Sequence, residues 1–500
     1  MRILLVNPPR IKQNMPTLRD EICFQDVIYT PFPIRLAQTA GVIIKKFPSA
    51  KIQIIDANAM NYDLRKLEDE MPQADILIFQ SAAGIIREDS QVATIAKKKN
   101  KNIKTIIIES VVAPIYPQRF LNDFPDIDII IQGQPERIIP DIIENIDNLS
   151  VVHGIAYRDC DSVKVNPESD LIADMDSIPY MAYDLFPMEK YSVSMIDAPM
   201  HEKVIPGICI RTTRDCPYGC PFCIIGSSPA RGYDGKWRAM SVKRVVDEIE
   251  HAINEWGVWG FFFWDETFTL DKKRAFEICR EIIDRKLRLE WRCLTRFDCI
   301  DKNLLEIMHK AGCRQIEFGL EAGDPQSRKQ LHKNFPDELA ISIVKQARKI
   351  GIRVNVDMIV GMPWETKQTL DKTLKLAKKL NADNVHLTMA FPYPGTKFYD
   401  IAEKENLLQI DDIYDLMINQ RIRIGAKPVV KTRNLSDADI ENGWKKIRSS
   451  INRYYLLRKV FLEPASFAKL FISCRNPEEF FVLLKKGIKR FFRILMFKTS

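Results

Sequence analysis

The chain has 500 residues, of which 46% are hydrophobic and 28% charged, as is typical of a globular protein large enough for two or three domains. No apolar run reaches the roughly 18 residues that a membrane span requires, and no signal peptide is recognised at the N-terminus. Without export, the 11 cysteines indicate reduced thiols in the cytoplasm and not a disulfide framework. The net charge of +8 resides in the last 60 residues, which carry 14 Lys and Arg against 4 Asp and Glu, so nucleic-acid binding by the whole surface is not indicated.

Residues 1–148 alternate strand-like and helix-like segments. Helix-length segments such as 33–47 and 87–100 separate five apolar runs of strand length: RILLVN, KIQIIDA, DILIFQS, KTIIIES and IDIIIQG. Strands that are apolar throughout and alternate with helices predict a parallel sheet covered on both faces. We therefore expect a doubly wound, Rossmann-like domain, with a ligand crevice at the carboxyl ends of its strands.

Residues 149–200 interrupt this alternation. The segments VVHGIAYRD and SVKVNP predict a β-hairpin, and the Pro- and aromatic-rich DMDSIPYMAYDLFPMEKY is interpreted as a linker.

Residues 201–425 repeat the alternation more regularly. The predicted strands are IPGICIRTT, GFFFWDE, LEWRCLTR, QIEFGLE, RVNVDMIVG and NVHLTMAF, and the predicted helices are 242–256, 272–286, 302–311, 337–350 and 367–380. Six strands with intervening helices predict a partial (β/α)6 barrel of TIM type, in which chemistry gathers at the carboxyl ends of the strands.

Residues 426–500 predict a C-terminal tail of basic amphipathic helices. Lys and Arg side chains interleaved with Phe and Leu suit a helix that lies on a lipid surface or binds a partner. A helix packed on the barrel with a solvated basic face is an equally open interpretation.

Three cysteines, Cys216, Cys220 and Cys223, follow the first predicted barrel strand with the spacing C-x3-C-x2-C. A structural zinc site would need a fourth Cys or His, and the sequence holds no second C-x2-C pair, which leaves only a zinc site with a distant ligand as an alternative. Three thiolates can instead hold a [4Fe–4S] cluster whose fourth iron is open to a chelating ligand. The amino and carboxylate groups of a methionine moiety would suit that iron.

This triplet, with Phe222 before its last cysteine, resembles the radical S-adenosylmethionine (SAM) superfamily. The resemblance implies that the cluster donates one electron to the SAM sulfonium, which releases methionine and a 5′-deoxyadenosyl radical. The segments FFFWDETFT, CRQIEFGLEAGD and DMIVGMPWET resemble the later strand ends that bind SAM. The candidates that the resemblance supplies are Phe222 beside the adenine, Asp265, Glu266 and Thr267 for the amino group, Arg292 or Arg296 near the carboxylate, Glu321 for the ribose and Gly361 where the backbone approaches the adenine.

Some of these residues have ordinary alternatives. Asp265 and Glu266 would also suit the N-cap of the following helix, and the two arginines would also suit a surface.

A doubly wound domain, a hairpin and a radical SAM barrel in this order resemble the cobalamin (B12)-binding branch of the superfamily. The resemblance implies a cobalamin at the strand ends of the first domain, where Ser81, Gly133 and Glu136 are the candidate contacts. The D-x-H-x-x-G loop of another cobalamin group is absent, so no histidine there can bind cobalt. Glu109 and Ser110 stand where many relatives have two glycines, and we expect their side chains to obstruct the cofactor. Cobalamin bound differently and a domain that keeps only the fold are both open.

The expected function is cobalamin-dependent C-methylation of an unactivated carbon by a radical SAM enzyme. The alternatives are cyclisation or rearrangement without methyl transfer, on a small-molecule or lipid-linked substrate, a methylthiotransferase, and a non-enzymatic protein that binds a membrane surface or a partner through its tail. The expected partners are the substrate and a one-electron reductant such as a flavodoxin or ferredoxin, without nucleic acid. The expected location is the cytoplasm, with peripheral contact to the inner face of the membrane as an alternative.

Overall fold

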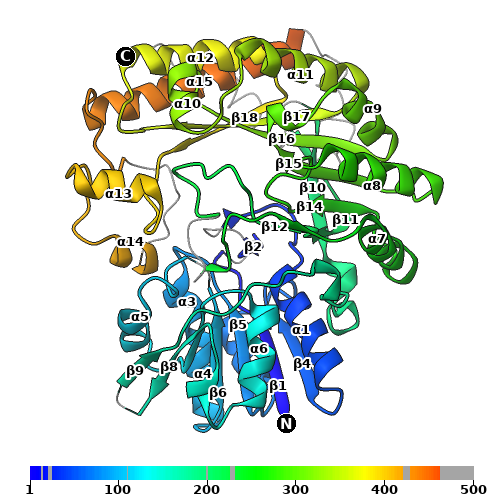
Figure 1. Cartoon of the computed structure of the whole chain (residues 1–500), viewed down its shortest axis with the longest axis vertical. Helices are drawn as coiled ribbons and strands as arrows, with labels where there is room; N and C mark the ends of the chain where they lie inside the picture. Colours follow the sequence, from blue (N-terminus) through cyan, green and yellow to red (C-terminus); the bar gives the residue numbers. More distant parts are fainter. Residues whose placement is uncertain are drawn as a thin grey trace, which may run out of the picture.

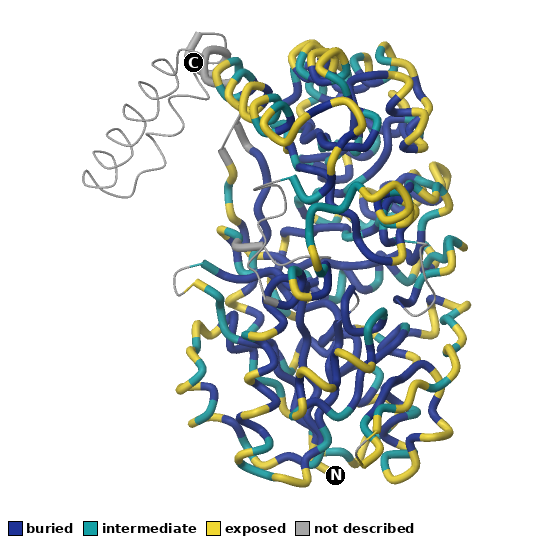
Figure 2. The backbone as a smooth tube through the Cα atoms, turned by 90° about the vertical axis from the view of Figure 1, so that its left-hand side faces the viewer, coloured by how far each residue is buried: buried dark blue, intermediate teal, exposed yellow. Residues whose placement is uncertain are grey.

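The structure is a computed structural model that describes residues 1–12, 15–20, 25–109, 111–160, 162–198, 201–225, 231–419 and 428–461. Figure 1 shows two sheets, one in the N-terminal half of the chain and one in the C-terminal half, each flanked by helices. Buried residues run without a break from one half into the other in Figure 2, and a single cluster of buried apolar side chains includes Leu5 of the first half and Phe318 of the second. The two halves therefore share a core.

The first sheet is the predicted doubly wound sheet. Its parallel strands lie in the order β4-β1-β5-β6-β7 and comprise β1 (Arg2–Asn7), β4 (Lys51–Asp56), β5 (Ile76–Gln80), β6 (Lys104–Ile108) and β7 (Ile129–Ile131). The helices are α1 (Ile34–Lys46), α2 (Leu64–Glu70), α3 (Ile86–Asp89), α4 (Gln91–Lys99), α5 (Pro117–Asp123) and α6 (Pro135–Glu144). This strand order places the topological switch point between β1 and β5, where ligands of such sheets bind.

The predicted hairpin forms, but it belongs to this sheet and not to a separate connecting segment. Strand β8 (Ile155–Asp159) pairs with β7 in antiparallel fashion and β9 (Ser162–Val165) pairs with β8, which extends the sheet to seven strands. The following segment packs on α1, where Gly41 lets the carbonyl of Tyr180 approach closely because a Cβ would lie 2.3 Å from that oxygen.

The second sheet contains all six predicted barrel strands, and they are parallel. They are β11 (His201–Ile210), β14 (Gly260–Phe263), β15 (Glu290–Thr295), β16 (Cys313–Glu321), β17 (Arg353–Val360) and β18 (Asn384–Met389). Their outer face carries α7 (Val242–Trp256), α8 (Lys272–Asp284), α9 (Lys302–Lys310), α10 (Pro325–Gln330), α11 (Asp337–Ile350) and α12 (Lys367–Leu380) (Figure 1). A seventh strand, β10 (Ser192–Ala198), pairs antiparallel with β11 at the edge. This strand is not predicted from the sequence, where its residues fall in the hairpin and linker range 149–200.

The described part of the C-terminal region is helical, as predicted. Within the predicted tail, 426–500, it comprises α15 (Asp437–Phe461), whereas α13 (Lys397–Lys404) and α14 (Ile413–Asn419) lie before it, inside the range predicted for the barrel. Helix α14 returns to the first domain, where the carbonyl of Met417 accepts a hydrogen bond from the backbone of Gly84 at 2.7 Å. The basic tail beyond residue 461 lies outside the described residues. None of the described helices combines the length and the apolar character that crossing a bilayer demands.

Candidate functional site

The three cysteines lie in a loop, residues 215–225, that we call the cysteine loop. It follows β12 (Thr213–Arg214), which pairs with β13 (Arg238–Ala239). Asp265, at the end of β14, accepts hydrogen bonds from the backbone of Thr212 (2.6 Å) and Thr213 (2.8 Å) and from the Thr212 hydroxyl (2.6 Å). Asp265 therefore anchors the base of the cysteine loop. It does not cap α8, because that cap is Asp271.

Arg296 lies against the cysteine loop. Its guanidinium stacks 3.5 Å from the ring centroid of Tyr218, and its Nη1 lies 3.9 Å from the Sγ of Cys220. It also forms a two-pronged ion pair with Asp298 at 2.8 and 2.9 Å. With only 4% of its surface exposed, Arg296 is not a surface charge. Arg292, four residues earlier, instead lies against Phe262, with its guanidinium 3.8 Å from the ring centroid.

The cysteine thiols suit an iron–sulfur cluster. All three are free and partly exposed. Burial raises the pKa of Cys223 to about 12 and also raises that of Cys220, while the charges of Lys333 and Arg296 favour the thiolate of Cys220. Iron would replace the protons of such thiols. No three His, Cys, Asp or Glu side chains of the described residues converge on one ion, which is compatible with a cubane because each of its thiolates binds a different iron.

Glu266 offers a partner for an ammonium group beside the cysteine loop. Its Oε2 is buried and has no hydrogen-bond partner among the described residues. Burial raises the pKa of this carboxyl to about 7, although the charge of Arg211 opposes the shift. The hydroxyl of the adjacent Thr267 lies 3.8 Å from the Sγ of Cys216. An orphaned carboxylate at this place fits the amino group of SAM, and the assignment of Glu266 and Thr267 to that group stays a prediction.

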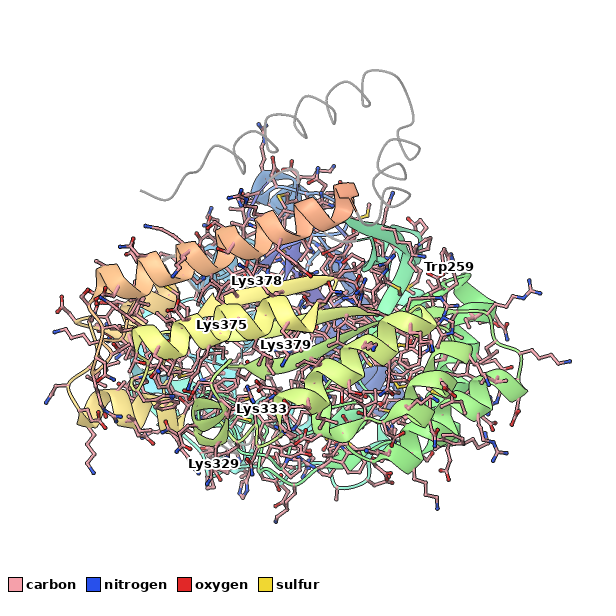
Figure 3. All side chains as sticks on the ribbon, turned by 90° about the horizontal axis from the view of Figure 1, so that it is seen from above. Trp259, Lys329, Lys333, Lys375, Lys378 and Lys379 are labelled. Carbon is pink, nitrogen blue, oxygen red and sulfur yellow. The ribbon has the colours of Figure 1, made fainter. Side chains whose placement is uncertain are left out.

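Glu321 ends β16 in a strained conformation, with φ +69°. Its carboxylate forms an ion pair with Lys333 at 3.1 Å. A Cβ on Gly319 would lie 2.4 Å from the Glu321 Oε1 and 2.6 Å from the Lys333 Nζ, so a side chain at this position would displace the pair from its present geometry. Lys333 is buried, unlike the exposed Lys329, Lys375, Lys378 and Lys379 that Figure 3 also labels. No motif in the sequence marks Lys333 as a site residue.

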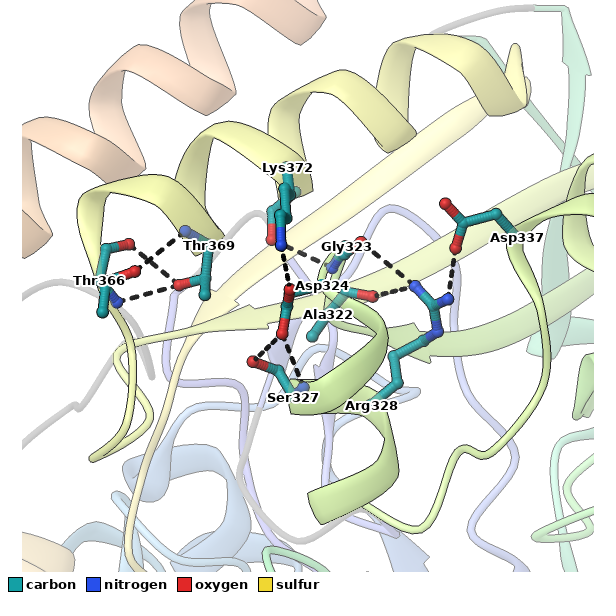
Figure 4. Close-up of polar contacts among 10 residues, drawn as sticks. Ala322, Gly323, Asp324, Ser327, Arg328, Asp337, Thr366, Thr369 and Lys372 are labelled. Atoms are coloured by element: carbon teal, nitrogen blue, oxygen red, sulfur yellow. Dashed lines mark hydrogen bonds and ion pairs between the residues drawn. The ribbon is translucent and has the colours of Figure 1, made fainter.

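The turn after Glu321 is fixed by a buried polar network (Figure 4). Arg328, fully buried, donates to the carbonyls of Ala322 (3.1 Å) and Gly323 (3.3 Å) and forms an ion pair with Asp337. The backbone of Gly323 donates to the Thr373 hydroxyl of α12 at 3.0 Å. These contacts hold the end of β16 against α12.

Three predicted segments meet in a small apolar cluster. Phe222 of the cysteine loop packs on a cluster that includes Ala322 after β16 and Met362 after β17. Gly361 has φ +94°, a conformation that favours glycine. A half-buried ring between two strand ends suits a flat heteroaromatic group, and the adenine position of Phe222 and Gly361 stays a prediction.

Glu365 holds the turn beside Gly361. It is 3% exposed and accepts hydrogen bonds from the backbone of Gly361 and Met362, yet burial raises its pKa to about 7. Because the folded-state pKa lies above the ordinary value of 4.5, the stabilisation from this proton is complete below pH 4.5 and is lost as the pH rises through 7. The loss amounts to about 3 kcal/mol.

We therefore expect Glu365→Gln, which keeps an acceptor but cannot ionise, to remove this part of the pH dependence. Free energies of unfolding in urea, measured at pH 5 and pH 8, should fall less for the variant than for the wild type. The exposed Glu255→Gln serves as the control. Equal pH dependence in all three proteins would contradict the assignment.

In the first domain, Ser81 and Glu136 contact protein groups. The Ser81 hydroxyl donates to Asp89 at 2.9 Å, and Asp89 in turn forms a buried ion pair with Arg19. Glu136, at the start of α6, forms a 2.7 Å ion pair with Arg214, two residues before Cys216. Gly133 adopts a positive φ of +141°. Roles for Ser81, Gly133 and Glu136 in cofactor binding stay predictions.

The expectation that Glu109 obstructs the crevice is wrong. Its carboxylate turns back into its own loop and accepts hydrogen bonds from the backbone of Val111 (2.9 Å), Val112 (2.7 Å) and Ala113 (2.8 Å). Only 2% of Glu109 is exposed. Ser110 lies outside the described residues.

The strand ends of the first domain fit a cofactor rich in amide groups. The Oε1 of Gln80, at the switch point, is buried without a hydrogen-bond partner within the described ranges, and so is the Oε2 of Glu136, which follows β7. The amide side chains of a corrin ring would supply donors to such acceptors. The first 150 residues contain no histidine, so these loops offer no imidazole to cobalt.

Comparison with known proteins shows which proteins this chain resembles. Residues 210–377 match the Radical SAM superfamily. An uncharacterized methyltransferase of Pyrococcus horikoshii is 29% identical over 470 residues, which cover 93% of this chain and 94% of that protein.

Two solved structures have the same fold. The cobalamin-dependent SAM radical enzyme OxsB, with aqua-cobalamin and SAM bound, matches with a TM-score of 0.69 and 17% identity over 99% of this chain and 72% of its own. The radical SAM methyltransferase TsrM from Kitasatospora setae, with cobalamin and a [4Fe–4S] cluster, matches with a TM-score of 0.65 and 16% identity over 91% and 88%. The predicted fold class, a doubly wound domain followed by a partial barrel, is confirmed.

Proposed function

Because the chain belongs to the radical SAM superfamily, in the branch with a cobalamin-binding-type domain before the barrel, we propose that it is a cobalamin-dependent methyltransferase that acts on an unactivated carbon. The observation that carries this proposal is the ion pair between Arg214 and Glu136. Arg214 directly precedes the cysteine loop, so the pair ties the base of this loop to the helix that starts at the strand ends of the first domain. A SAM site and a cobalamin site built from these elements would face each other across one chamber.

When bound, the cluster supplies the electron that cleaves SAM, and cobalamin supplies the methyl-transfer chemistry. Cys216, Cys220 and Cys223 would hold the cluster. Glu266 and Thr267 would bind the SAM amino group, Arg296 would set the charge beside Cys220, and Glu321 would bind the ribose. Phe222 and Gly361 would frame the adenine, and Ser81, Gly133 and Glu136 would line the cobalamin site.

The test is anaerobic reconstitution of the full chain with iron, sulfide and cobalamin, followed by incubation with SAM and dithionite. We expect 5′-deoxyadenosine and S-adenosylhomocysteine together, detected by mass spectrometry. 5′-Deoxyadenosine without S-adenosylhomocysteine would support cyclisation or rearrangement instead. Absence of both products would overturn the proposal.

A radical SAM enzyme requires a one-electron reductant and a substrate. We propose a small flavodoxin- or ferredoxin-type protein as the reductant and a small molecule as the substrate. The proposed domain division keeps the barrel at 201–425 and the helical region at 426–500, and it assigns the hairpin within 149–200 to the first domain. A cytoplasmic location, with or without membrane contact through the tail, stays a prediction.

A further inference from the structure

In its middle layer the inward face of the second sheet is polar, whereas the interior of a closed eight-stranded barrel is packed with branched apolar side chains. Along β15, β16 and β17 the outward residues Trp291, Ile316 and Val356 are fully buried beneath the helices. Four inward residues keep accessible surface and form a layer that we call the barrel floor: Arg292, Glu317, Asp357 and His386. A polar layer that remains accessible inside a barrel indicates space for a ligand, because burial of such groups without partners is costly.

Aromatic rings hold Arg292 in the barrel floor. Its guanidinium lies 3.8 Å from the ring centroid of Phe262 and donates to the Tyr29 hydroxyl at 3.4 Å. Its Nε is buried and finds no hydrogen-bond partner in the described part of the chain. The guanidinium is thus fixed in position with hydrogen-bonding capacity to spare.

The opposite side of the barrel floor is more open. Asp357 lies 3.5 Å from the Nδ1 of His386, and the two side chains are 27% and 58% exposed. The amide of Asn355 reaches Asp357 only at 3.4 Å. The Asp357 carboxylate therefore retains acceptor capacity toward the interior of the barrel.

The barrel floor holds two carboxyl groups, Glu317 and Asp357, against one permanent cation, Arg292. Burial and the neighbouring charge of Asp357 raise the pKa of Glu317 to about 8, against the opposing charges of Arg292 and His386. The charge of the exposed Glu202 carboxylate on β11 also raises the pKa of Arg292. Glu317 and Asp357 therefore share one proton. A second cation bound beside them would let both carboxyl groups ionise.

We propose that the barrel floor binds the protonated amino group of the substrate, with Asp357 and Glu317 as its acceptors. This inference rests on the proposed function and adds the substrate class. Glu317 precedes Glu321 by four residues on β16, about 13 Å at the rise of a strand. A substrate anchored by its ammonium group thus presents a carbon several bonds away to the SAM site.

The test uses n-butylammonium as the probe and n-butanol as its neutral counterpart, titrated calorimetrically into the reconstituted full chain at pH 7. Titration in two buffers of different ionisation enthalpy reports proton release. We expect saturable binding of n-butylammonium with release of a proton, and no binding of n-butanol. Glu317→Gln and Asp357→Asn should each weaken binding about tenfold or more, a 1.4 kcal/mol effect. Glu306→Gln, on the outer surface of α9, is the matched control.

No saturable binding of n-butylammonium, or equal binding by the wild type and both variants, would overturn the inference. Thermal unfolding of each variant verifies that it is folded. SAM cleavage by the same preparations separates the two proposals. Enzyme that forms 5′-deoxyadenosine but does not bind n-butylammonium retains the proposed function and lacks this site.

Discussion

Replacement of any one of Cys216, Cys220 and Cys223 by alanine will abolish 5′-deoxyadenosine formation. A three-thiolate cluster has no spare protein ligand, and no fourth cysteine lies in the cysteine loop. Loss of a ligand must cost more than loss of an outer partner of a metal ligand, which typically costs 10–100-fold. We therefore expect activity to fall by more than about 100-fold. Iron content after reconstitution and 5′-deoxyadenosine yield measure the effect.

Cys160 provides the matched control. It is an exposed free thiol in the β8–β9 turn, far along the chain from the cysteine loop. Cys160→Ala should retain full iron content and activity. Retention of iron and SAM cleavage by one of the three loop variants would show that a different residue completes the cluster.

For some helices the sequence predicted the first and the last residue correctly. The residues that end these helices lie directly next to them in the sequence. Helix α7 begins after Ser241, whose hydroxyl accepts from the Arg244 backbone, and it ends at Gly257 with φ +63°. Helices α11 and α12 end at Gly351 and Asn381, both in the left-handed region. Such caps depend on neighbouring residues alone, so they can be read without the fold.

Features that depend on distant partners were missed. Strand β10 is an edge strand defined by its pairing with β11, and its residues follow a segment rich in Pro and Asp. The sequence marks Asp265 as a candidate site residue. Its role in anchoring the cysteine loop could not be predicted, because its partners Thr212 and Thr213 lie about 50 positions away. Lys333 could be found only from the folded structure, because its pairing with Glu321 requires the turn after β16 to double back.

The contact between Glu136 and Arg214 joins residues 78 positions apart, so it too could not be predicted from neighbouring residues. A substitution that breaks it is expected to have a large effect on the stability of the protein. Arg214→Met should lower the free energy of unfolding by about 3–5 kcal/mol, since it leaves a buried carboxylate unpaired. The side chains of the pair are only 1% and 8% exposed, and the Glu136 Oε2 already has no partner within the described residues. Urea unfolding of the metal-free protein, followed by circular dichroism, measures the change.

Two further variants separate the loss of pairing from a general loss of packing. The double variant Arg214→Met/Glu136→Leu should recover most of the stability, because no charge is then left unpaired in the interior. Arg137→Met, in the same helix as Glu136, breaks an exposed pair with Asp141 and should cost at most about 0.5 kcal/mol. If Arg214→Met costs no more than Arg137→Met, the cysteine loop is not held by the first domain, and the proposed chamber shared by the two cofactor sites is contradicted.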